Sequence, residues 1–207
     1  MHNIIGDIAG NYETLLALLK KMPDGEVISV GDMIDRGPRS KEVVEWFMKN
    51  GKAILGNHEH MMLDFINKTH FYQEGIWFYN GGTATWRSFK MNIPDEVVSW
   101  MEKLPLYMEI DKTLVSHSFV DYDLQSSLKI LDLNGLDSSI LWNRHQPHRI
   151  PEYDMQIAGH NSQFGLRDFS DDGGVFAKCI DASCSGVLTG INLPSMQIFQ
   201  QRVIDKE

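Results

Sequence analysis

The sequence predicts an α/β fold with two sheets, and three observations support this. Over the first sixty residues, short apolar segments alternate with amphipathic ones, which is the pattern of β-α-β-α-β units. The C-terminal third carries further short apolar segments separated by Gly, Asp and Ser turns, which predicts a second, more antiparallel sheet. Neither a repeat nor a low-complexity linker interrupts the 207 residues, so we expect one domain over residues 1–207.

The N-terminal part is expected to form three strands with helices between them. The predicted strands are residues 3–6, 27–30 and 53–55. Asn11 is expected to cap the first helix, whose apolar residues recur at helical spacing over residues 15–22. Ser40 is expected to cap the second helix, and a third helix is expected to begin at Glu59.

The remainder of the chain divides into an aromatic middle part and a strand-rich end. Residues 77–106 are expected to form a cap or insertion with a helix around Val97 to Met101. The short strands predicted after it lie at residues 114–115, 156–158, 175–177, 187–188 and 197–199.

Charge and composition restrict the partners of this protein. Its formal net charge of -9 argues against duplex nucleic acid, because such binding depends on clustered Lys and Arg. The sequence contains no apolar run long enough to cross a bilayer and no secretory leader pattern, so we expect a cytoplasmic protein with no membrane partner. Cys179 and Cys184 are accordingly expected to stay reduced and to have a structural role.

Polar clusters follow three consecutive predicted strands. These clusters are residues 6–10, 31–37 and 56–59. Because the carboxyl ends of neighbouring strands open onto one crevice, Asp7, Asp32 and Asn57 are expected to converge. His117 and His160 each follow another predicted strand and offer imidazole nitrogens to the same crevice.

These residue types predict a metal site. Mixed oxygen and nitrogen donors suit manganese, iron or zinc better than magnesium or calcium. One carboxylate placed between two ions can bridge them, and Asp32 is the natural bridge. Two ions roughly 4 Å apart can clamp the attacking and leaving oxygens of a phosphoryl displacement, and metal-bound water with a pKa lowered to about 7 is then the nucleophile.

Together the three clusters resemble the Gly-Asp-x-His-Gly, Gly-Asp-x-Val-Asp-Arg-Gly and Gly-Asn-His-Glu signatures of the phosphoprotein phosphatase branch of the calcineurin-like phosphoesterases. The likeness spans nearly the whole chain, and the sequence resembles the small bacterial and phage Ser/Thr protein phosphatases most. It continues through His117, Gly159-His160, Asn80-Gly81-Gly82-Thr83, Leu141-Trp142-Asn143-Arg144 and Ile180-Asp181. The resemblance implies a four-layer α/β/β/α sandwich, in which helices flank two mixed β-sheets.

The resemblance also implies a binuclear metal centre. Asp7 and Asp32 would hold the first metal, while Asp32, Asn57, His117 and His160 would hold the second. Manganese is the expected ion, with iron or zinc as alternatives.

Four further residues receive catalytic roles from the resemblance. His58 would protonate the leaving alkoxide, with its imidazole oriented by Asp35. Arg36 and Arg144 would clamp phosphate oxygens, a task that suits the planar guanidinium group, and Arg149 is a nearby competitor for the second of these roles.

The sequence departs from the family at Ala9, where the family has a histidine ligand of the first metal. A methyl group cannot coordinate, so the first metal is expected to bind more weakly, to be completed by water, or to be absent. The expected activity is hydrolysis of phosphate monoesters, foremost phosphoserine or phosphothreonine on proteins. The alternatives are a symmetrical dinucleoside polyphosphate hydrolase and a phosphatase-like protein that binds phosphorylated partners and turns them over poorly.

Overall fold

Two five-stranded sheets form the centre of the computed structural model, which describes residues 1–68, 75–121, 123–128 and 140–206. The first sheet has the order β10-β9-β1-β2-β3, with β1 (His2–Ile5), β2 (Glu26–Ser29), β3 (Lys52–Ala53), β9 (Val187–Leu193) and β10 (Gln197–Arg202). The second has the order β4-β5-β6-β8-β7, with β4 (Tyr107–Ile110), β5 (Thr113–Ser116), β6 (Met155–Ala158), β7 (Arg167–Asp171) and β8 (Gly174–Cys179).

The two sheets pack against each other through alternating side chains. Ile4 and Ile28 point into the core that the first sheet shares with the second, where they meet Val115 of β5. Their neighbours Ile5 and Val27 point to the opposite face and pack against the helices. This alternation follows from the two-residue period of a strand, and it buries both faces of the first sheet.

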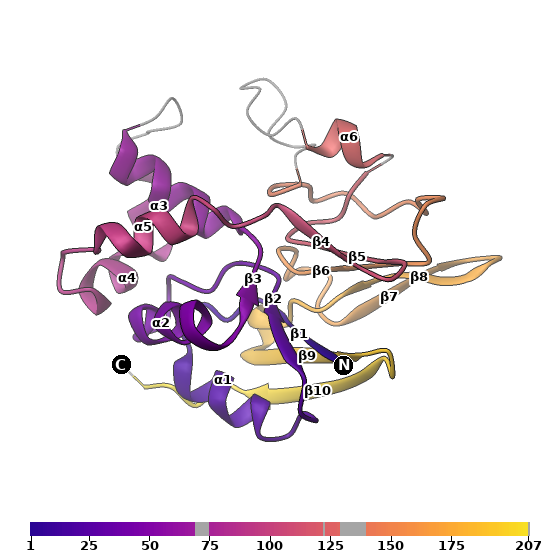
Figure 1. Cartoon of the computed structure of the whole chain (residues 1–207), viewed down its shortest axis with the longest axis horizontal. Coiled ribbons are helices and arrows are strands. Elements are labelled where there is room, and N and C mark those ends of the chain that lie inside the picture. The colour runs from indigo at the N-terminus through magenta and orange to yellow at the C-terminus, as the bar shows by residue number, and fades with distance from the viewer. Residues whose placement is uncertain (69–74, 122, 129–139, 207) are drawn as a thin grey trace.

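Helices flank this pair of sheets, most of them on the side of the first sheet (Figure 1). They are α1 (Tyr12–Leu19), α2 (Ser40–Asn50), α3 (Asn57–Asn67), the π-helical turn η1 (Phe78–Gly82), α4 (Thr83–Ser88), α5 (Asp95–Met101), the short α6 (Leu124–Ser127) and the 3-10 turn η3 (Ser183–Ser185). Residues of the predicted cap, among them Trp77 and Met101, join the same apolar core as α1 and α2. The middle part of the chain therefore completes the helical layer on the first sheet.

The expectation of a more antiparallel second sheet is wrong. Strands β9 and β10 join the first sheet, where β9 lies antiparallel to β1, and β5, β6 and β8 pair in parallel. Each sheet therefore has two parallel and two antiparallel pairings. The side-chain amide of Asn192 donates to Asn3 Oδ1 at 2.8 Å across the β1–β9 pair, a contact that apolar patterning cannot reveal.

Of the two predicted helix caps, Asn11 occupies the N-cap position of α1 but its side chain makes no capping hydrogen bond, and Ser40 is wrong. The amide of Asn11 donates to carbonyls of the preceding turn, and the carboxylate of Asp205 instead accepts hydrogen bonds from the N–H groups of Glu13 and Thr14 at 3.0 and 2.9 Å. Ser40 is the first residue of α2, not its cap, and the cap position is the residue before it. The third helix begins two residues earlier than expected, at Asn57 within the third polar cluster.

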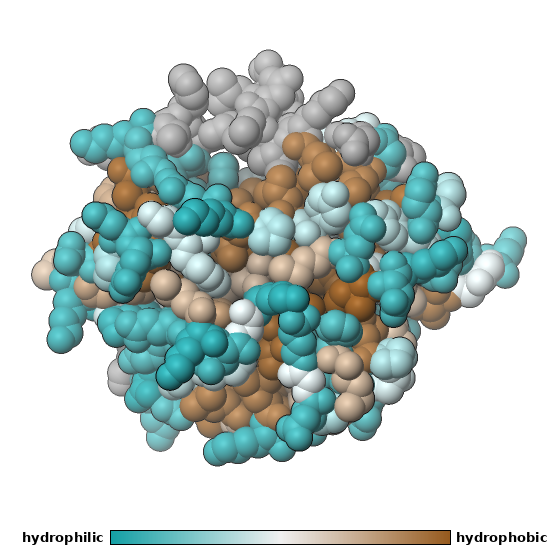
Figure 2. Space-filling view, in the orientation of Figure 1, coloured by the Kyte–Doolittle hydropathy of each residue, from teal (hydrophilic) through white to brown (hydrophobic). Residues whose placement is uncertain are grey.

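Surface properties are consistent with this architecture. On the face shown in Figure 2, hydrophilic residues are interspersed with apolar areas. Within the described ranges, no helix combines the length and the apolar character that a bilayer span requires.

Candidate metal centre

The loops that follow strands of both sheets bring five predicted residues together. Asp7 follows β1, Asp32 follows β2, and Asn57 begins α3 just after β3, while His117 and His160 follow β5 and β6 of the second sheet. All five are buried, with exposed fractions from 0% to 7%. The site therefore lies where the carboxyl ends of parallel strands from both sheets meet.

The turns at this site contain an unusual backbone conformation. Ala9, Asp32, Asp35, Arg36 and His160 all have φ between 50° and 72°. Non-glycine residues adopt this left-handed region rarely and at an energetic cost, and such residues cluster at functional sites. The fold therefore stabilises a local geometry that the isolated loops would not prefer.

Glu59 holds these loops in place from a fully buried position. Its carboxylate accepts hydrogen bonds from the backbone N–H groups of Asp32 and Met33, both at 2.8 Å, and of Gly56 at 3.0 Å. Burial and the negative charge of Asp32 raise the pKa of Glu59 to about 7, although these N–H groups oppose the shift. The sequence predicted only that Glu59 favours the N-terminal end of its helix. The structure shows that its carboxylate bonds backbone groups of both the 31–37 and the 56–59 cluster.

Three electron-pair donors face one another at the centre of the site. His117 Nδ1 lies 2.8 Å from the carbonyl oxygen of Val30, which can only accept, so Nδ1 carries a hydrogen. His117 Nε2 then faces Asn57 Oδ1 at 2.8 Å and an oxygen of Asp32 at 3.3 Å. A cation placed among these three atoms would be bound by all of them.

His160 adds a second imidazole nitrogen to this donor set. Its Nδ1 lies 3.1 Å from Asn57 Oδ1, and its Nε2 is buried without a hydrogen-bond partner among the described residues. Burial, followed by the charge of His117, lowers the pKa of His160 to about 3, so the ring is neutral. A neutral imidazole whose Nδ1 faces Asn57 Oδ1 is suited to bind a cation on that side of the ring.

The carboxylates of Asp7 and Asp32 complete this donor set. Ligand atoms of Asp7, Asp32 and His117 all lie within 4.8 Å of one another. Burial raises the pKa of Asp7 well above its ordinary value, and the negative charges of Asp181 and Asp32 raise it further. Burial also raises the pKa of Asp32, but the positive charges of His117 and His58 reverse that effect. The residues present therefore fit a divalent cation, which would allow both carboxylates to be ionised.

A buried histidine–aspartate pair adjoins the donor set. His58 Nδ1 donates to Asp35 at 2.6 Å, and Asp35 also accepts hydrogen bonds from Trp77 Nε1 at 3.0 Å and Thr85 Oγ1 at 2.6 Å. Burial alone lowers the pKa of His58, but Asp32 and Asp35 outweigh it and raise the pKa above 6.5. His58 Nε2 accepts a hydrogen bond from Arg36 Nη2 at 3.1 Å.

Sequence reasoning missed Trp77 and Thr85, which hold Asp35 in place from 42 and 50 residues away. One available signal was the neighbouring Asn80-Gly81-Gly82-Thr83 segment. Gly81 has φ of 110°, its carbonyl accepts the N–H of Arg36 at 3.2 Å, and a Cβ at Gly81 would lie 2.9 Å from Arg36 Cγ. The segment from Trp77 through η1 and α4 therefore supports both Asp35 and Arg36.

The arginines differ in their placement. Arg36 is exposed and lies against His58, while Arg144 is exposed on the rim, where its carbonyl accepts the amide of Asn161 at 3.1 Å. Arg149, the competitor for the role of Arg144, is engaged elsewhere, since it forms an ion pair with Asp171 at 2.8 Å.

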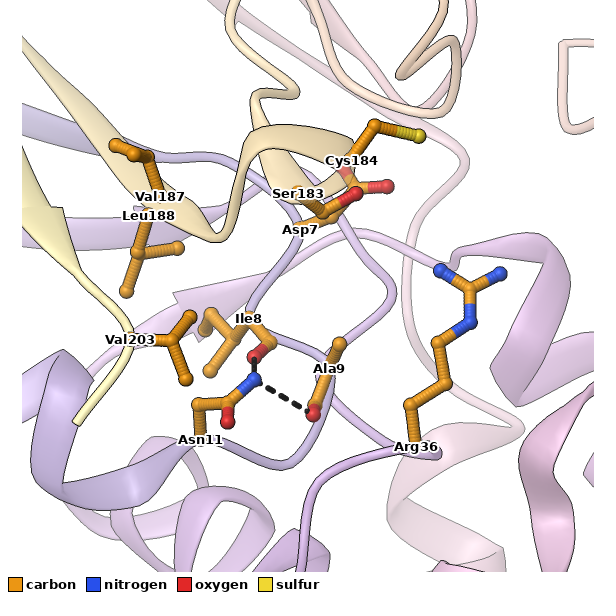
Figure 3. A pocket seen from close by; sticks show the side chains of 10 residues that line it. All are labelled: Asp7, Ile8, Ala9, Asn11, Arg36, Ser183, Cys184, Val187, Leu188 and Val203. Atoms are coloured by element: carbon orange, nitrogen blue, oxygen red, sulfur yellow. Dashed lines mark hydrogen bonds between the residues drawn. The ribbon is translucent and has the colours of Figure 1, made fainter. Parts of the chain in front are cut away.

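Ala9 lies next to Asp7 and lines a cavity with it, as Figure 3 shows. Its side chain offers no ligand atom on this side of Asp7.

Comparison with known proteins gives a consistent result. The family model described as "Calcineurin-like phosphoesterase" matches residues 3–177. A symmetrical bis(5'-nucleosyl)-tetraphosphatase from Vibrio parahaemolyticus is 28% identical over 133 residues, or 60% of this chain and 47% of that protein. Serine/threonine-protein phosphatase 2 from Escherichia coli is 29% identical over 153 residues, or 67% of this chain and 66% of that protein. The chain thus spans about half the length of the first relative and about two thirds of the second.

Solved structures share the fold over almost the whole chain. A metallophosphoesterase from Sphaerobacter thermophilus has a TM-score of 0.60 at 15% identity, covering 99% of this chain and 89% of that one. A protein serine/threonine phosphatase from Saccharomyces cerevisiae has a TM-score of 0.60 at 18% identity, covering 100% and 81%. The prediction of two mixed sheets flanked by helices is confirmed.

The contacts of Asp35 predict the effect of Thr85→Val. This change removes a hydroxyl that bonds a fully buried carboxylate, so the free energy of unfolding should fall by about 1–3 kcal/mol. Denaturant unfolding measures the loss. Thr83→Val, at an exposed position of the same helix, is the matched control and should change stability little. Equal effects of the two changes would contradict the importance of this hydrogen bond.

Proposed function

We propose, from the premise that this chain belongs to the calcineurin-like phosphoesterase family, that it is a metal-dependent hydrolase of phosphate monoesters acting on phosphoserine and phosphothreonine in proteins. The observation that carries this proposal is the convergence of Asp32, Asn57 and His117 next to the buried His58–Asp35 pair. A cation-binding donor set beside an oriented imidazole supplies both the charge and the proton that phosphoester cleavage needs.

In this proposal the five converging residues hold the cations. Asp7 and Asp32 hold the first, and Asp32, Asn57, His117 and His160 hold the second, so that Asp32 is shared. Manganese is the proposed ion, with iron or zinc as alternatives, because the donors mix oxygen and nitrogen. When bound, the ions supply Lewis-acid polarisation of the phosphoryl oxygens and activation of water.

His58 is proposed to protonate the leaving oxygen through Nε2. Its Nδ1 is fixed by the bond to Asp35, which orients the ring and stabilises its protonated form. Because Nε2 now accepts a hydrogen bond from Arg36, the guanidinium must turn away before this atom can donate a proton. A bound phosphate provides the reason, since it is a stronger acceptor for Arg36 than a neutral imidazole nitrogen.

Arg144 is proposed as the second phosphate ligand. Its guanidinium is exposed on the rim of the site, and its positive charge is close enough to lower the pKa of His160, although burial and His117 have larger effects. Two arginines on opposite sides of a phosphate can bind its equatorial oxygens and hold it in place for in-line attack.

Two other functions are supported by specific observations. The tetraphosphatase relative is as similar as the phosphatase relative, at 28% against 29% identity, which supports hydrolysis of a dinucleoside polyphosphate as the second candidate. The third candidate is a low-activity phosphatase-like protein that binds phosphorylated partners, and it is supported by Ala9, which offers no ligand atom to a metal.

Direct comparison of substrates tests the proposal. With manganese present, a phosphothreonine peptide should be hydrolysed with a kcat/KM at least about tenfold above that of diadenosine tetraphosphate. Release of inorganic phosphate and of nucleotide measures the two reactions. A preference for the dinucleotide would favour the second candidate, and binding of the peptide with negligible turnover would favour the third.

Variants of two adjacent residues separate metal binding from proton transfer. Asn57→Ala should lower the metal content, because it removes an oxygen that faces His117 and His160. His58→Ala should retain the metal and lower kcat by roughly 10²–10⁴-fold. Mass spectrometry of the metal content and steady-state kinetics measure both. Each variant serves as the control for the other, and equal metal loss would refute the assigned roles.

Restoring a ligand at position 9 tests the effect of Ala9. Histidine tolerates the φ of 50° at this position better than most residues, so Ala9→His should bind an additional ion per chain and hydrolyse substrate faster. Equilibrium dialysis with manganese measures the stoichiometry. Ala9→Leu fills the space without offering an electron pair and should show no gain. Full metal content and high activity in the unmodified protein would contradict a weakened first site.

A further inference from the structure

A cavity of about 320 Å³ opens directly beside the proposed phosphate site (Figure 3). Asp7, Ala9 and Arg36 line it on the side of the metal centre. Its volume is at the lower end of the range of small-ligand pockets, and it is large enough for one amino-acid side chain. A group bound to Arg36 through phosphate would therefore lie next to this space.

The other side of the cavity is an apolar wall, which consists of Ile8, Val187, Leu188 and Val203. These residues come from the loop after β1, the start of β9 and the segment after β10. Asn11 donates to the carbonyls of Ile8 and of the next residue at 2.8 and 3.0 Å, which fixes the loop at the base of the wall. Val203 is 40% exposed, so apolar surface here remains in contact with water.

The charges of this cavity restrict its occupant. Of the described residues that line it, Arg36 is the single cation and Asp7 the single carboxylate. A phosphate on Arg36 uses this cation, so no positive side chain of the lining remains to bind a second anion. An acidic side chain or a polyphosphate chain is therefore a poor occupant, whereas a neutral apolar group gains by leaving water.

Ala9 contributes to the size of this space. Because its methyl group lines the cavity, a larger side chain at this position would project into it. The residue that weakens the first metal site thus also keeps the cavity open beside Asp7.

We infer that this cavity is a specificity subsite for a large aliphatic or aromatic side chain next to the phosphorylated residue of a substrate protein. The inference rests on the proposed function and adds a sequence preference to it. Burial of the apolar side chain against Ile8, Leu188 and Val203 holds the peptide while Arg36 binds its phosphate. The preferred substrates therefore carry a large apolar residue, and no acidic residue, beside phosphoserine or phosphothreonine.

A matched set of phosphothreonine peptides tests this inference on the manganese-loaded protein. The peptides carry leucine, alanine or aspartate on both sides of phosphothreonine and are otherwise identical. The leucine peptide should have a kcat/KM at least about tenfold above that of the alanine peptide, and the aspartate peptide should be the poorest. Fluorescence anisotropy of non-hydrolysable phosphonate analogues should give the same order of affinities.

Two adjacent variants locate the effect in the cavity. Val203→Trp fills the apolar side and should remove the preference for leucine, while Ile204→Trp, at an equally exposed residue outside the cavity, should retain it. Equal kcat/KM values for the three peptides, or equal effects of the two variants, would overturn the inference and leave the proposed function intact. Failure of every peptide to bind or react would overturn both.

Discussion

The structure depends on one constraint, which is the burial of two neighbouring carboxyl groups. Asp7 and Asp32 lie 7% and 4% exposed, and their ligand atoms lie within 4.8 Å of one another and of His117. Two ionised carboxylates at this separation repel each other strongly away from water. A divalent cation removes that cost, and Nδ1 of His160 adds a nitrogen donor at the same place. The surrounding fold holds these carboxylates and His117 close together in the arrangement that a cation needs.

The scaffold that holds them spans both sheets and the helical layer. Loops after strands of the two sheets position the candidate donor residues, and the buried carboxylate of Glu59 fixes the loop of Asp32 against the start of α3. On the other side, Trp77 and Thr85 orient Asp35 and through it His58. The left-handed conformations of the loops are maintained by these contacts, because unsupported loops would relax. Order in the helical layer is therefore linked to the geometry of the proposed proton donor.

Local sequence patterns predicted where helices and strands lie better than they predicted which strands pair and which side chains contact each other. Asp7, Asp32 and Asn57 could be grouped because each follows a buried strand, and the ends of parallel strands meet by geometry. Strand β9 was assigned to the wrong sheet, because a run of residues buried on both faces does not reveal which strand it pairs with. The cap of α1 by Asp205 and the contacts of Asp35 with Trp77 and Thr85 join residues 42 to 192 positions apart, which no local pattern encodes. Glu59 was part of a predicted polar cluster, but its role could not be predicted because it depends on the loop of Asp32 that folds over it.

Anomalous diffraction from a crystal soaked in manganese tests the central claim most directly. The account predicts a manganese peak in contact with the side chains of Asp32, Asn57 and His117, and a weaker or absent one on the side of Asp7 and Ala9. A crystal that shows no manganese near Asp32, with the same side chains still in place, would contradict it.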